Sequence, residues 1–243
     1  MKRETCKHRS TAGIRIIGGS LKRSKIEVLD QLGLRPTPNR VRETLFNWLT
    51  PSIQGASILD CFSGSGALGL EALSRGASTC TFVEQDPQVA KYIYTNIERF
   101  QLYTQANVLA NNVFEIPEEV VIHADIIFAD PPFHDGISQK FLTWVRDKVH
   151  QDSRLVIECG EREVLNLEGF EKIKELKAYG VALHLNARSV SRRDLGVICR
   201  RRELCVNSTF AARASGSSTG EAITPLAERY SSGSPFTKRK QHR

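Results

Sequence analysis

The chain has 243 residues, of which 40% are hydrophobic and 25% charged, so it is long enough for one globular domain with appendages. Because it shows no signal peptide, no membrane-spanning apolar run and no C-x-x-C pair among its six cysteines, we expect a cytoplasmic protein without a disulfide framework or a metal site. The net charge of +7 is uneven: residues 1–50 and 189–243 each hold 11 Lys and Arg against 4 Asp and Glu, whereas residues 51–188 hold 12 against 19.

This charge pattern predicts three regions. Residues 1–50 are expected to form a basic, RNA-facing extension, and residues 51–188 an acidic core that binds a small molecule. Residues 189–243 are basic, lack apolar periodicity and are expected to be a disordered tail. Basic ends around an acidic core indicate a polyanionic partner; the alternative is that these charges serve only solubility.

The N-terminal region predicts a hairpin followed by a helix. The runs 14–17 and 25–29 alternate like strands, and Gly18-Gly19-Ser20 between them is a turn signal. Thr37 suits a helix N-cap and Pro38 the first position of a helix that runs through Leu49. Three arginines place positive charge around the start of this helix and are the candidate RNA contacts: Arg35, Arg40 and Arg42.

From residue 57 strands alternate with helices. The expected strands are 57–61, 79–83, 106–110, 125–130 and 154–158, and the expected helices are 67–75, 87–99 and 137–149. Two final runs, 170–176 and 180–186, form a hairpin. Such alternation predicts an α/β fold of the Rossmann type, a mostly parallel seven-stranded sheet with helices on both faces and an antiparallel hairpin at its C-terminal edge.

A glycine-rich turn follows the first of these strands. Gly64, Gly66 and Gly69 fit the G-x-G-x-x-G pattern, which lets a backbone pass close to a nucleotide ligand. Glu84 ends the next strand, 20 positions after Gly64, which is the spacing of an acid that binds ribose hydroxyls. The turn therefore predicts a nucleoside cofactor at the carboxyl ends of the strands.

A second motif, Asp130-Pro131-Pro132-Phe133, follows the strand 125–130. Two successive prolines give a rigid extended turn without backbone donors, which displays carbonyl oxygens and the Asp130 carboxylate as acceptors. An aromatic ring follows directly. Acceptors beside a ring are what an exocyclic amine on a flat base requires, so these four residues are the candidate catalytic residues.

These motifs together resemble the class I S-adenosylmethionine-dependent methyltransferases, and more narrowly the RsmD-like family of 16S ribosomal RNA guanine-N2 methyltransferases. The matching segments are 15–19, 34–38, 41–49, Leu59-Asp60 with the glycine turn, 82–84 and 130–133. The resemblance covers about residues 13–187, and the block 34–49 is its most specific part. It implies methyl transfer from S-adenosylmethionine to 16S ribosomal RNA or to an assembling small ribosomal subunit, by a monomer.

The resemblance also implies roles for individual positions. Asp60, Phe62, Gly64, Gly66, Glu84 and Asn112 would bind the cofactor. Family members usually have Asp at the position of Asn112, against the adenine amine, and Asn112 can still accept a hydrogen bond there. Asp130 and the Pro131 carbonyl would bind the target amine, and Phe133 would stack on the guanine.

Two alternatives remain open on the sequence. The motif at 130–133 also fits a DNA adenine or cytosine amino-methyltransferase, although no long inserted recognition segment separates the motifs. A non-catalytic RNA-binding protein with a relic cofactor pocket would also have basic ends. Binding of labelled S-adenosylmethionine and analysis of the methylated nucleoside distinguish these possibilities.

Overall fold

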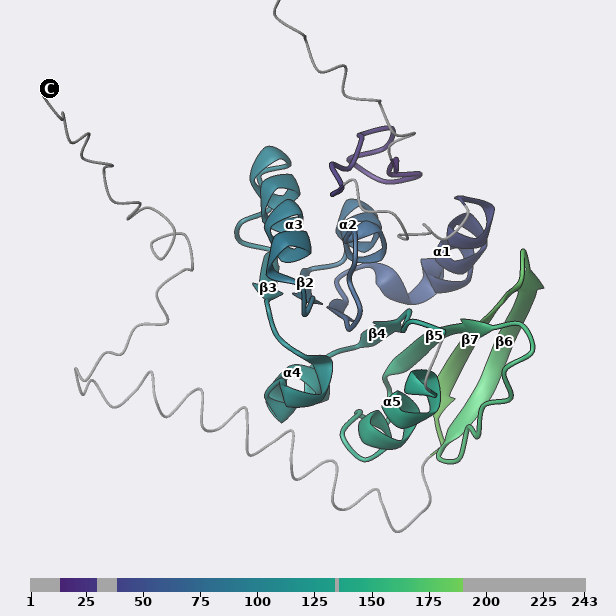
Figure 1. Ribbon diagram of the computed structural model, residues 1–243. Coiled ribbons are helices and arrows are strands. Elements are labelled where there is room, and N and C mark those ends of the chain that lie inside the picture. The colour runs from purple at the N-terminus through teal and green to yellow at the C-terminus, as the bar shows by residue number, and fades with distance from the viewer. Residues whose placement is uncertain (1–13, 30–38, 134–135, 190–243) are drawn as a thin grey trace, which may run out of the picture. The chain divides into compact units, whose positions relative to one another are not determined.

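The computed structural model describes residues 14–29, 39–133 and 136–189. Its seven strands form one sheet in the order β3-β2-β1-β4-β5-β7-β6 (Figure 1). The strands are β1 (Ser57–Asp60), β2 (Thr79–Val83), β3 (Ala106–Leu109), β4 (Ile126–Ala129), β5 (Arg154–Gly160), β6 (Phe170–Ala178) and β7 (Val181–Arg188). The helices are α1 (Asn39–Ile53), α2 (Ala67–Ser74), α3 (Pro87–Arg99), α4 (Glu118–Ile122) and α5 (Ile137–Arg146), with a 3₁₀ turn η1 (Val113–Glu115).

The sheet confirms the predicted fold. Strands β1 to β5 pair in parallel, whereas β7 is antiparallel to both β5 and β6. β1 lies at the centre of the five parallel strands, and the chain leaves it for β2 on one side and reaches β4 on the other, which is the switch point where α/β sheets bind ligands. The sequence analysis missed α4 and η1, because an apolar run as short as 120–122 carries no helical period.

Helices cover both faces of the sheet and bury two apolar clusters. Helices α1, α2 and α3 lie on one face, and α4 and α5 on the other (Figure 1). The first cluster includes Phe46, Leu70, Phe82 and Ile93, and the second includes Ile127, Phe141 and Ile157. Because the central strands β1, β4 and β5 are buried between helices, their carboxyl ends and the loops that follow determine the site.

The predicted N-terminal hairpin is reduced to a single antiparallel bridge between Arg15 and Lys25. The physical reason is that a side chain of α2 binds backbone N–H groups that would otherwise pair with the second strand of a hairpin. The Ile17 and Gly18 amides donate to the Glu71 carboxylate at 2.6 and 2.8 Å. A Cβ on Gly19 would lie 1.7 Å from a backbone oxygen of α2, so glycine here allows close packing on the helix rather than a hairpin turn.

Residues on both sides of position 50, where a division was expected, contribute to one core. Ile16, Ile26 and Leu45 belong to the same apolar cluster as residues of the sheet. Helix α1 continues beyond its predicted end at Leu49, through Pro51, because Ile53 is buried in that cluster. The expected tail at 190–243 lies outside the described residues. Within the ranges that are described, no helix combines the length and apolar character needed to cross a membrane.

Candidate active site

The glycine turn between β1 and α2 has the backbone that the sequence pattern requires. Gly64 and Gly66 both have positive φ, 49° and 73°, and Gly66 is the N-terminal cap residue of α2. A Cβ added to Gly64 would meet no heavy atom within 4 Å, so one side of the turn is open. A Cβ on Gly69 would lie 2.3 Å from the Phe82 ring, so this glycine lets α2 pack directly on β2.

Glu84, directly after β2, holds the glycine turn in place. Its carboxylate accepts from the Gly64 amide at 2.9 Å and from the Asp86 amide at 2.9 Å. A carboxylate offers about four acceptor positions, so two of them are still available for a ligand. The sequence analysis assigned Glu84 to ribose hydroxyls, and the geometry adds a second role in shaping the turn itself.

Asp60, the last residue of β1, is 2% exposed and accepts from the Gly69 amide at 3.0 Å. Burial raises the pKa of Asp60 to about 7, the Gly69 N–H opposes this shift, and the negative charges of Asp130 and Glu84 add to it. The ends of β1, β2 and β4 therefore bring three carboxylates within electrostatic range of one another. Such a concentration of negative charge suits a positively charged ligand.

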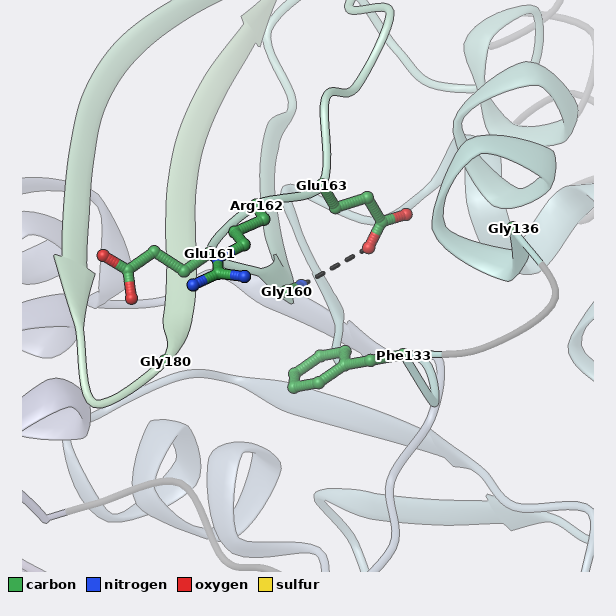
Figure 2. A pocket seen from close by; sticks show the side chains of 7 residues that line it. All are labelled: Phe133, Gly136, Gly160, Glu161, Arg162, Glu163 and Gly180. Carbon is green, nitrogen blue, oxygen red and sulfur yellow. Dashed lines mark hydrogen bonds between the residues drawn. The ribbon is translucent and has the colours of Figure 1, made fainter.

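Asp130 also begins the Asp-Pro-Pro-Phe segment, which leads from these carboxylates to a cavity. Pro131 is buried and Pro132 exposed, and the Phe133 ring is 49% exposed. Phe133 lines an open cavity of about 740 Å³ with six residues from other segments (Figure 2). These residues are Gly136, Gly160, Glu161, Arg162, Glu163 and Gly180. The chain therefore connects the carboxylate Asp130 to a cavity with an aromatic ring in its lining, three residues further along.

The sequence analysis missed Arg162, which is exposed on the loop after β5 and lies across the cavity from Phe133 (Figure 2). The Glu163 carboxylate accepts from the Gly160 amide at 3.3 Å and closes this loop. One signal could have identified Arg162: it follows a parallel strand at the carboxyl edge, where ligands bind. The prediction ended that strand at Glu158, two residues too early.

Two other predicted cofactor residues have contacts within the protein. The Asn112 side-chain oxygen accepts from the Phe114 amide at 3.0 Å and caps the 3₁₀ turn η1. A second lone pair of that oxygen remains for the adenine amine, so the predicted role stays a prediction. The half-buried Phe62 ring packs edge-on against Phe141, with 5.5 Å between ring centroids, and its contact with a cofactor is likewise a prediction.

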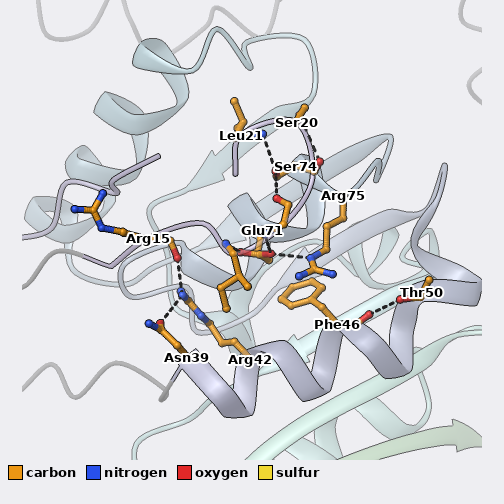
Figure 3. A network of polar contacts seen from close by, with 12 residues as sticks. Arg15, Ser20, Leu21, Asn39, Arg42, Phe46, Thr50, Glu71, Ser74 and Arg75 are labelled. Atoms are coloured by element: carbon orange, nitrogen blue, oxygen red, sulfur yellow. Dashed lines mark hydrogen bonds and ion pairs between the residues drawn. The ribbon is translucent and has the colours of Figure 1, made fainter. Parts of the chain in front are cut away.

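The arginines predicted to bind RNA have different environments. Arg42 is 1% exposed, and its Nη2 donates to the Arg15 carbonyl at 2.6 Å and to Asn39 Oδ1 at 2.9 Å (Figure 3). Its assignment as an RNA contact is therefore wrong, because the side chain lies in the core. Arg40 is exposed and lines a second cavity, of about 370 Å³. Arg35 lies outside the described residues.

The part of the chain that the structure describes contains no group of three His, Cys, Asp or Glu residues arranged to hold a metal ion. The residues that are present fit a nucleoside cofactor with a positive charge instead. They provide an open glycine turn, an acid with free acceptor positions after β2, and a cluster of carboxylates.

Comparisons with known proteins identify the family of the chain. The family model described as Conserved hypothetical protein 95 matches residues 14–186. A curated relative, the ribosomal RNA small subunit methyltransferase D of Escherichia coli strain K12, is 44% identical over 140 residues, which are 58% of this chain and 70% of that protein.

Solved structures show the same fold. The Escherichia coli protein yhhF superimposes with a TM-score of 0.65 at 34% identity, over 74% of this chain and 99% of that chain. An RNA methyltransferase from Salinibacter ruber, solved in complex with S-adenosyl-L-homocysteine, has a TM-score of 0.53 over 65% of this chain and 97% of that one. Its identity is 13%, so this likeness concerns the fold alone.

Proposed function

The chain belongs to the family described as Conserved hypothetical protein 95, which is the RsmD-like family, and on this premise we propose that it methylates the exocyclic N2 amine of a guanine in 16S ribosomal RNA. The methyl donor is S-adenosylmethionine. The substrate is the RNA itself or the assembling small ribosomal subunit, and the reaction takes place in the cytoplasm, where these subunits form.

One observation carries this proposal: Asp130 belongs to the carboxylate cluster at the strand ends and also begins the segment that carries Phe133. It lies close enough to Asp60 to raise the pKa of that carboxyl, and it is three residues before Phe133, which lines the large cavity. A methyl donor among the carboxylates and a flat acceptor on Phe133 would therefore meet at Asp130. Bringing two reactants together in this way supplies much of the catalysis in a displacement reaction.

The cofactor supplies a methyl group bound to a positively charged sulfur. Glu84 would accept from the ribose hydroxyls, Asn112 from the adenine amine, and Asp60 with the glycine turn would face the methionine part. The negative charges of Asp60, Glu84 and Asp130 favour the positively charged donor over its neutral-sulfur product, so they also favour release of the product.

Asp130 acts on the target amine as an acceptor. The lone pair of guanine N2 is delocalised into the ring, and a carboxylate is too weak a base to remove a proton from this amine before methyl transfer. Asp130 and the Pro131 carbonyl instead accept N–H groups, direct the lone pair toward the methyl group and stabilise the positive charge that develops on nitrogen. Phe133 stacks on the base, and the proton leaves after transfer.

We infer a role in the selection of guanine for Arg162, which lines the cavity. An arginine can donate two parallel hydrogen bonds to O6 and N7, which only guanine presents as a pair of acceptors. This residue lines the cavity opposite Phe133, so it would read the edge of the base away from Asp130. We infer that Arg162 discriminates against adenine and cytosine.

The test is methyl transfer from labelled S-adenosylmethionine to naked 16S ribosomal RNA, to small subunits and to genomic DNA, followed by mass spectrometry of the nucleosides. N2-methylguanosine in the ribosomal RNA or the subunits is expected. If N6-methyladenosine or a methylated cytosine is found without N2-methylguanosine, the acceptor is adenine or cytosine and the proposal of guanine is wrong. A protein that binds the RNA but transfers no methyl group would be the non-catalytic alternative.

A further inference from the structure

The turn between β6 and β7 is strained and carries an exposed aromatic side chain. Ala178 pairs with Val181, so the loop consists of only Tyr179 and Gly180. Both residues have positive φ, 59° and 83°, which defines the type of two-residue turn that favours Asn-Gly. A tyrosine at the first position costs conformational free energy. Tyr179 is also 58% exposed, so burial does not compensate for this cost.

This turn contributes to both cavities. Gly180 lines the cavity of Phe133, which is the proposed site for the target base. Tyr179 and Ala178 line the second cavity, of about 370 Å³. An aromatic side chain therefore stands directly beside the proposed position of the guanine, at a backbone position where stability alone would select another residue.

The remaining lining of the second cavity suits a nucleotide. It comes from Arg40, Val41 and Thr44 of α1 and from Leu176 of β6, and none of the described residues that line this cavity is acidic. On the outer strand β6, the neighbouring acid Glu175 is paired with lysines on either side, at 3.1 and 3.8 Å. An apolar floor, an aromatic ring and an exposed arginine match a base with its phosphate.

We propose that the second cavity holds a nucleotide next to the target guanine in single-stranded RNA, with Tyr179 stacked on its base and Arg40 bound to its phosphate. This inference rests on the proposed function, because it takes the cavity of Phe133 as the guanine site. The turn would separate the two bases and keep the target guanine unstacked, as recognition of single-stranded RNA requires.

Tyr179→Asn separates this role from a structural one. Asn-Gly is the preferred sequence for this turn, so the variant should melt at the same temperature as the wild type or higher. Its affinity for a fluorescent 16S ribosomal RNA fragment, and its KM for RNA, should worsen about fivefold to a hundredfold, which is the range for losing one base–aromatic stack. Tyr179→Phe keeps the ring and should keep both values, and S-adenosylmethionine affinity should not change.

Tyr103→Asn is the matched control. Tyr103 is 63% exposed and precedes β3, which is the edge strand at the opposite end of the sheet from β6. Its replacement should leave RNA affinity unchanged. Arg40→Gln tests the phosphate contact. It should reduce the slope of log affinity for RNA against log salt concentration by about one, whereas Lys91→Gln on the distant helix α3 should not.

The outcomes identify which idea fails. If the wild type makes N2-methylguanosine but Tyr179→Asn binds RNA as tightly as the wild type, this inference is overturned and the proposed function stands. If Tyr179→Asn affects only intact subunits and not naked RNA, the turn contacts a ribosomal protein, and the inference is again overturned. If the wild type methylates no ribosomal RNA, the proposed function fails and this inference fails with it.

Discussion

Replacing Glu71 by alanine should strongly destabilise the fold. The side chain is 0% exposed, and its carboxylate accepts from the Ile17 amide at 2.6 Å and the Gly18 amide at 2.8 Å. It also accepts from Arg75 Nε at 2.7 Å (Figure 3). Its negative charge also raises the pKa of the buried Arg42, which burial lowers. One side chain therefore satisfies two backbone donors and balances two arginines.

The magnitude follows from what alanine leaves behind. Each buried amide that loses its acceptor costs about 1–3 kcal/mol. Arg75 is 18% exposed and can be hydrated again, whereas the buried Arg42 keeps its bonds to the Arg15 carbonyl and Asn39 and loses the attraction of the Glu71 charge. These contributions overlap, so we expect a total of about 3–5 kcal/mol, a large share of the 5–15 kcal/mol that typically stabilises a domain.

The measurement is urea unfolding followed by tryptophan fluorescence. Glu71→Gln keeps the shape and one oxygen acceptor, so its loss of stability should lie between those of the wild type and Glu71→Ala. Glu98→Ala is the matched control, because Glu98 is exposed on α3, and its effect should stay within about 0.5 kcal/mol. If Glu71→Ala destabilises no more than Glu98→Ala, the buried network does not hold the N-terminal segment as argued.

Three further predictions concern the site. Asp130→Ala should lower methyl transfer more than tenfold with nearly unchanged cofactor affinity, and turnover within tenfold of the wild type would contradict its role. Glu84→Ala should weaken S-adenosylmethionine binding by about 1.5–3 kcal/mol in calorimetry, since a hydrogen bond to a charged group is lost; an unchanged affinity would remove it from the cofactor site. Because the pKa of Asp60 is raised to about 7, its carboxyl stays protonated up to that pH in the folded protein, whereas in the unfolded chain it ionises near pH 4. The free energy of unfolding should therefore fall as the pH rises from about 4 to 7 and level off above 7. The affinity for the positively charged cofactor should rise through pH 7, because Asp60 becomes negatively charged there. Asp60→Asn should flatten the pH dependence of both stability and cofactor affinity. If either keeps its slope in this variant, another group is responsible for the titration.

The elements that the sequence predicted well depend on local signals. The glycine turn could be located because Gly64 and Gly66 occupy positions that need positive φ, and the final hairpin because Gly180 does. The alternation of buried strands with amphipathic helices then determined the sheet, since connections between parallel strands allow few arrangements. The family followed from the block 34–49 and the motif at 130–133.

Features that depend on distant partners could not be predicted in this way. Arg42 follows the apolar spacing of α1 with Leu45, Phe46 and Leu49, but a charged residue is normally assigned to the surface. Its bonds to the Arg15 carbonyl, 27 residues away, and to Asn39, together with the charge of Glu71, allow its burial. In the same way, Tyr179 reads as an ordinary turn residue until the fold places it in the lining of the second cavity, next to Gly180 in the lining of the first.

The contact between the N-terminal segment and Glu71 also has a consequence for the order of events during synthesis. Ile17 and Gly18 leave the ribosome early, but their amides pair with a side chain that is 54 and 53 residues further along the chain. The segment 14–28 therefore cannot complete its backbone hydrogen bonds until α2 has been made and has packed on β1 and β2. The segment 14–28 is consequently exposed to proteases on the nascent chain until α2 has been synthesised and has folded.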